Sequence, residues 1–154
     1  MTHLTRFSFG ATSAIITCLA FVISLSKIDN PNLIIGSLLV IAIADNISDS
    51  LGIHIYQESD LKKSEIVRSS TFFNFLTRFL VILIFILFVK FLPITYAIIF
   101  SIVWGLSLLL VLSYLIAKEQ NVNPYSAIFW HISIAILVII ASNFLSGWIM
   151  SAFS

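Results

Sequence analysis

Residues 79–89 read FLVILIFILFV, an apolar run without a single polar side chain. This run forms the centre of a longer hydrophobic segment, about residues 71–92, which ends before Pro93. A helix needs about 20 such residues to cross the ~30 Å hydrocarbon core of a bilayer. The segment therefore predicts a membrane-spanning helix.

Four further segments have the same character, so the chain is predicted to be an all-α, polytopic membrane protein. The expected bundle of five transmembrane helices forms a single domain over residues 1–154, with spans at about 8–25, 32–56, 71–92, 94–117 and 125–150. Pro31 and Pro93 close two of the spans, and Pro124 fits the first turn of the last one.

The composition agrees with this class. Hydrophobic residues make up 60% of the 154 positions and charged residues 10%, whereas a soluble domain carries about 25% charged residues. A net charge of +1, with no basic run longer than Lys62–Lys63, argues against a nucleic-acid partner. The single cysteine, Cys18, excludes an internal disulfide and a cysteine-based metal cluster.

The orientation follows from the lysine and arginine residues, which gather in short cytoplasmic loops. If the N-terminus is cytoplasmic, five of these residues lie on that side and two on the other. The five are Arg6, Lys62, Lys63, Arg68 and Lys118, and the two are Lys27 and Lys90. This asymmetry favours an N-in, C-out topology.

Two carboxylates stand inside the second apolar segment, where residues 36–54 read GSLLVIAIADNISDSLGIH. Asp45 and Asp49 are spaced i, i+4, which places them on one helical face about 6 Å apart. An ionised residue near the bilayer centre costs about 2.5–3.5 kcal/mol and persists where it faces protein, water or an ion. Asn46 and Ser50 form an adjacent stripe, and oxygen ligands suit hard or borderline divalent cations. We therefore predict a metal site at Asp45, Asp49, Asn46 and Ser50.

A structural alternative is that the acids pair with a buried base. Arg78 lies roughly 10 Å in from the cytoplasmic end of its span, at a level similar to that of Asp49. A pure Asp49–Arg78 pair would leave Asp45 unexplained. His131 lies at the same depth, as a ligand or relay or as a simple hydrogen-bonding residue. The expected pathway-lining or relay residues are Ser13, Thr17, Arg78 and His131.

The first span is rich in small and hydroxyl-bearing residues. Gly10 and Ala14 form a small-xxx-small pair, which allows two helix backbones to approach closely. Together with the costly polar sector of the second span, this pair predicts a homodimer. Gly10 and Ala14 would form its face, with Ser13 and Thr17 near the two-fold axis.

Two stretches carry a resemblance to a known family. Residues 9–17, FGATSAIIT, resemble the opening of the first helix in the vacuolar iron transporter (VIT/CCC) family, and residues 42–49, AIADNISD, resemble its second-helix Ala-x-Gly-Glu stretch. Residues 51–59, LGIHIYQES, resemble a short prokaryotic branch of that family. The family's second-helix glutamate falls on Asp45, whereas its first-helix Asp-Gly falls on Ser13-Ala14, and its long acidic insert is absent.

The resemblance implies proton-coupled export of a divalent cation, typically Fe²⁺ or Mn²⁺, from the cytosol by a homodimer in the bacterial cytoplasmic membrane. The cation and protons would be cargo, with no permanently bound cofactor. Two alternatives stay open. A non-transporting scaffold or accessory subunit is compatible with the missing first-helix acid. A metal-dependent membrane transferase would use Asp45-x-x-x-Asp49 as half of a Mg²⁺-pyrophosphate motif, but the second acidic motif is lacking, so the chain is not expected to be an enzyme.

Overall fold

The structure, a computed structural model, describes residues 3–28 and 30–153, and their side chains from Ser8 to Ala152 apart from residue 29. All of its regular elements are helical in that part of the chain. They are α1 (His3–Leu25), a short 3-10 turn η1 (Ser26–Ile28), α2 (Pro31–Val40), η2 (Ile41–Asp45), α3 (Asn46–Ser59), α4 (Ser64–Phe91), α5 (Ile94–Glu119) and α6 (Pro124–Phe153).

The described residues contain five helical segments that are long and apolar enough to cross a membrane, as the sequence predicts. One of them is the continuous series α2–η2–α3, which begins at Pro31 with its Leu33 N–H bonded to the Asn30 side chain. The helices extend beyond the expected spans, because α3 runs to Ser59 and α4 begins at Ser64. The polar stretches that extend the two helices, residues 57–59 and 64–70, include no Gly or Pro, which would disfavour a helix.

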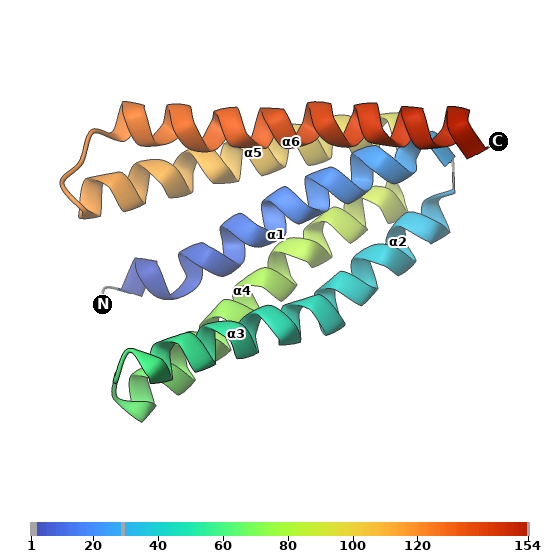
Figure 1. The fold of residues 1–154 in the computed structure, drawn as a ribbon. Coiled ribbons are helices and arrows are strands. Elements are labelled where there is room, and N and C mark those ends of the chain that lie inside the picture. Colours follow the sequence, from blue (N-terminus) through green and yellow to red (C-terminus); the bar gives the residue numbers. More distant parts are fainter. Residues whose placement is uncertain (1–2, 29, 154) are drawn as a thin grey trace.

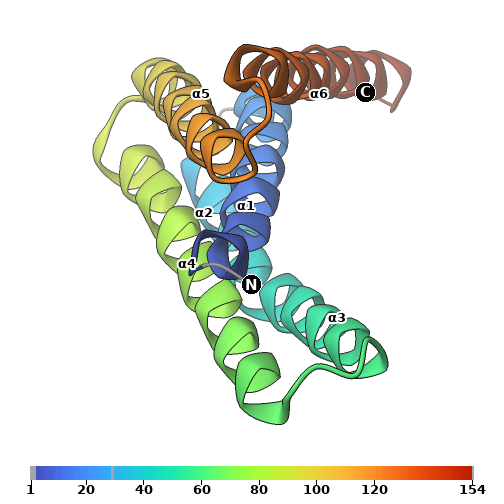
Figure 2. The ribbon, with the colours of Figure 1, turned by 90° about the vertical axis from the view of Figure 1, so that its left-hand side faces the viewer.

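The central helix of the bundle is α1, and one pair of helices lies on each side of it (Figure 1). We call these pairs the α3–α4 arm and the α5–α6 arm. Figure 2 looks along the bundle from the end that holds the N-terminus, where the two arms diverge and α1 lies between them. The α3–α4 and α5–α6 turns both lie at this end.

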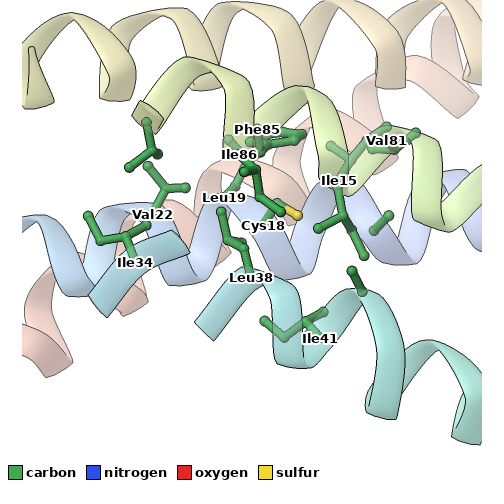
Figure 3. Packing of buried hydrophobic residues seen from close by; sticks show 14 of the residues in the cluster. Ile15, Cys18, Leu19, Val22, Ile34, Leu38, Ile41, Val81, Phe85 and Ile86 are labelled. Atoms are coloured by element: carbon green, nitrogen blue, oxygen red, sulfur yellow. The ribbon is translucent and has the colours of Figure 1, made fainter. Parts of the chain in front are cut away.

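The apolar core joins α1 to α2 and α4, as Figure 3 shows. Its fully buried members include Ile15, Cys18, Leu19 and Val22 of α1, Ile34 and Leu38 of α2, and Ile82 and Phe85 of α4. The last helix is peripheral, since 44% of the most apolar stretch of α1 is buried but only 6% of that of α6. The outer helices therefore leave a broad apolar surface, which is compatible with a place in a lipid bilayer.

The small residues of α1 are used inside the protomer. Ala14 is fully buried, and a Cβ atom added to Gly10 would lie 2.6 Å from the backbone oxygen of Asn74 and 2.7 Å from its Oδ1. Gly10 thus permits a close approach between α1 and α4. Both residues are therefore buried within the protomer, which does not favour the predicted use of Gly10 and Ala14 as a dimer face.

Candidate functional site

The second apolar segment is not a regular α-helix throughout. Between Ile41 and Asp45 it widens into one π-helical turn, where the Asn46 N–H bonds to the Ile41 carbonyl, five residues back, and to that of Ile43. Single π-turns are rare and occur often at functional sites. This one ends at Asp45, so it sets the direction in which the acidic pair points.

Asn46 compensates for the irregular turn. In a regular helix its N–H would bond to the Ala42 carbonyl, four residues back. Here the Asn46 side-chain Nδ2 donates to that carbonyl at 3.3 Å, and also to the Phe75 carbonyl of α4 at 3.0 Å. The side chain is fully buried. It therefore connects the π-turn to α4, and it does not lie on the exposed side of Asp45 and Asp49.

Arg78 of α4 brings the two acids together. Its Nη2 donates to Asp45 Oδ2, and its Nη1 donates to Asp49 Oδ2. Nη1 also donates to Ser13 Oγ of α1 at 2.6 Å, and that hydroxyl donates to Asp49 Oδ2 at 3.2 Å. We call Ser13, Asp45, Asp49 and Arg78 the ion-pair cluster. In the sequence-based alternative, Arg78 pairs with Asp49 alone and Asp45 has no partner. In the structure, the guanidinium of Arg78 bonds to both acids.

The ion-pair cluster is closed on one side and open on the other. The side chain of Arg78 is 1% exposed, whereas that of Asp45 is 48% exposed and that of Asp49 is 32% exposed. Among the described residues, no donor bonds to the Oδ1 atom of either acid. A charged group at membrane depth is costly in contact with lipid. The open side therefore requires water, an ion or another protein surface.

A row of polar contacts continues from the cluster along the interface of α3 and α4. Asn74 Nδ2 donates to Ser50 Oγ at 3.2 Å, His54 Nδ1 lies 3.1 Å from Thr71 Oγ1, and Ser70 Oγ donates to Gln57 Oε1. We call this row the polar ladder, with Asn46 as its first member. Ser50 is thus engaged with α4 and, like Asn46, does not share the open face of Asp45 and Asp49.

Sequence reasoning overlooked the α4 half of this ladder. Its signal is present, because Ser70, Asn74 and Arg78 recur every four residues and so share one face of α4. On α3 the matching positions are 46, 50, 54 and 57. The recurrence of polar residues within apolar helices indicates a helix–helix contact, not a solvent-facing surface.

The other predicted pathway residues divide between the two arms. Ser13 and Arg78 contact the acids, and Thr17 is partly buried one turn further along α1. His131 lies in the α5–α6 arm, where its Nδ1 is 2.8 Å from Ser113 Oγ. It lines a separate cavity of about 360 Å³ between α1, α5 and α6. The structure does not bring His131 to the ion-pair cluster.

A single protomer does not complete a metal site from its acids. Within the described residues, no group of three or more His, Cys, Asp and Glu side chains lies close enough to hold a metal ion. The cluster offers two carboxylates that already share one guanidinium. The arrangement can accept a further cation or hydrogen-bond donor only through the Oδ1 atoms on its open side.

The comparisons with known proteins add no family to this geometry, because no protein-family model, curated protein or solved structure matches the chain.

Proposed function

We propose that this chain is an integral protein of the bacterial cytoplasmic membrane that exports a divalent cation such as Fe²⁺ or Mn²⁺ in exchange for protons. It works as a homodimer in which the two ion-pair clusters face each other. The observation that carries the proposal is a pair of carboxylates within an otherwise apolar helical segment, paired with the buried Arg78 and themselves 48% and 32% exposed.

The charge of the cluster favours a dimer and a divalent ion. Two carboxylates and one guanidinium leave one net negative charge in each protomer. Two facing clusters would carry two negative charges, which one divalent cation or two protons neutralise. An exchange of one for the other keeps the low-dielectric site neutral in both states, and uncompensated charge in such a site is expensive.

The surface beside the acids suits the approach of a second copy. Ala44, Ser48 and Gly52 repeat every four residues on an exposed face of η2 and α3, next to Asp45 and Asp49. Small residues at this spacing let membrane helices pack closely. This surface takes the place of Gly10 and Ala14 as the dimer face. Ser48→Cys is then expected to crosslink to its symmetry mate in membranes, since native Cys18 is buried. Lack of crosslinking at Ser48 would show that this surface does not form the dimer interface.

The resemblance to vacuolar iron transporters supports the same cargo. Asp45 stands at the position of that family's second-helix glutamate. The family's first-helix aspartate is replaced by Ser13, which in this structure bonds to both Asp49 and Arg78. We propose that Asp49 supplies, from the second span, the charge that the first helix lacks.

A scaffold or accessory subunit is the second candidate. It is favoured by one specific observation, namely that Arg78 pairs with both acids and so satisfies them without any cargo. In that case the cluster would act only to hold α1, α3 and α4 together. Transport of metal by the purified protein separates the two candidates.

The decisive experiment is metal flux in proteoliposomes containing the purified protein, with Fe²⁺ or Mn²⁺ and an imposed pH gradient. We expect flux from the parent, and none above empty liposomes from Asp45→Asn, which keeps the volume and removes the charge. Asp60→Asn is the matched control, because it makes the same change in the exposed α3–α4 turn, where Asp60 pairs with Lys62 at 3.0 Å. Equal flux from parent and Asp45→Asn would make the acids structural and favour the scaffold.

The proposed N-in, C-out topology has its own test. Single cysteines at Ser64, at the start of α4, and at Ser154 are labelled with a membrane-impermeant reagent from each side. Ser64 should react only from the cytoplasmic side and Ser154 only from the outside. Reaction of both from the same side would rule out an odd number of spans.

A further inference from the structure

The guanidinium of Arg78 holds the two acids unequally. Its Nη1 end is anchored twice, by Asp49 Oδ2 and by Ser13 Oγ at 2.6 Å. Asp49 receives an additional hydrogen bond from Ser13 at 3.2 Å. The Nη2 end bonds to Asp45 alone. Asp45 is also the more exposed acid, at 48% against 32%.

This asymmetry determines which of the two ion pairs, Asp45–Arg78 or Asp49–Arg78, separates more easily. Separating Asp45 from Arg78 breaks one ion-paired hydrogen bond and leaves the other end of the guanidinium in place. Separating Asp49 breaks bonds to both Arg78 and Ser13. The Nε of Arg78 is buried without a hydrogen-bond partner in the described residues, so no hydrogen bond at that atom resists a small rotation of the guanidinium plane.

We propose that Arg78 is a built-in competitor for the transported cation: in the empty state it pairs with both acids, and on cation entry it releases Asp45 while remaining bound to Asp49 and Ser13. This inference rests on the proposed function, since it assigns the order of events at the same site. Asp45 is then the exchangeable ligand, and Arg78 and Ser13 are positioning residues.

The competitor role sets the affinity of the site. A fixed positive charge within a few ångströms of a divalent cation opposes binding strongly, even in a partly polar environment. Arg78 therefore keeps the resting site weak enough to release its cargo, and it prevents two uncompensated carboxylates from facing the membrane. Removal of the guanidinium charge should tighten cation binding, whereas mere damage to a structural ion pair should weaken it or leave it unchanged.

The test is equilibrium binding of Mn²⁺, followed by its electron paramagnetic resonance signal, to the purified full-length protein. Arg78→Gln should bind Mn²⁺ at least about tenfold more tightly than the parent. Arg68→Gln is the matched control, because Arg68 lies on the same helix roughly 15 Å away and is exposed. Its affinity should equal that of the parent.

A second variant covers the case in which Arg78→Gln does not fold. Arg78→Lys keeps the charge but replaces the two-ended guanidinium by a single ammonium, which pairs with one acid and leaves the other free. It should bind Mn²⁺ more tightly than the parent, by less than Arg78→Gln. Equal affinity in the parent and the folded Arg78 variants would overturn the competitor role and leave the transporter intact. Absence of Mn²⁺ binding in all of them would overturn both proposals.

Discussion

The two arms of the molecule are held together in different ways. Across the interface of α3 and α4, side chains are joined by the polar ladder and by the ion pairs of Arg78. Between α5 and α6, the described residues show one such contact, from Ser113 to His131 at 2.8 Å. The rest of that interface is apolar packing.

The difference bears on how the positions of apolar helices are specified when lipid surrounds them. Apolar side chains gain little from meeting one another when the surrounding lipid is equally apolar, so packing alone permits small shifts between helices. Directional hydrogen bonds do not permit such shifts, because their geometry is lost when the helices move. The ladder fixes the register of α3 against α4 and so places Arg78 between Asp45 and Asp49. In the part of the chain that the structure describes, the α5–α6 arm contains no comparable ion-pair cluster, so its two helices do not have to keep one fixed register.

The largest expected effect is the loss of the central charge. Arg78→Met should lower the free energy of unfolding by about 3–5 kcal/mol, because both acids lose their counter-charge at membrane depth. His131→Leu, at the polar contact of the other arm, should lower it by about 1 kcal/mol. Both are measured by SDS titration in mixed micelles. Equal losses would mean that the two arms are held in the same way.

An intermediate effect is expected at the first member of the ladder. Asn46→Leu removes the amide that bonds to the carbonyls of Ala42 and Phe75, and leaves these buried acceptors without that partner. We expect a loss of about 2 kcal/mol in the same titration. Ser113→Ala is the comparison in the other arm and should cost about 1 kcal/mol. A greater loss at Ser113 than at Asn46 would contradict the proposed division.

The smallest effect is expected at Gly147 of α6, which is compared with Gly10 at the contact of α1 with α4. Gly10→Ala drives a methyl group into the Asn74 backbone of α4, which cannot move aside, and should cost about 1–3 kcal/mol. Gly147→Ala meets only the flexible end of Lys27, 2.8 Å away, and should stay within about 0.5 kcal/mol of the parent. Similar costs for both would show that the contact of α6 with Lys27 of η1 is as tight as the contact of α1 with α4.

Part of the candidate site was accessible from the sequence because depth along a helix follows from residue number. Counting at 1.5 Å per residue put Arg78 and Asp49 at one level, and the structure pairs them. The same count put His131 at that level too, yet it lies in the other arm. Depth gives only the position of a residue along the helix axis. Its position across the bundle depends on which helices are neighbours.

The orientation of Asn46 and Ser50 was less accessible for a local reason. The sequence gives no warning of the π-turn at Ile41–Asp45, because residues 41–44 are as apolar as the regular helix before them. The turn shifts every later side chain around the helix axis. It turns Asn46 and Ser50 toward α4 and leaves Asp45 on the open face.

The sequence by itself determined the number and approximate extent of the apolar helices, since these depend on runs of side chains and on the prolines between them. It also determined that charged groups lie within two of those helices. Only the tertiary structure decided that one arginine serves both acids, that Gly10 packs against α4, and which side of the cluster is open. Those outcomes depend on which helix faces meet, and contacts between distant parts of the chain, not local pattern, decide how the helices rotate against one another.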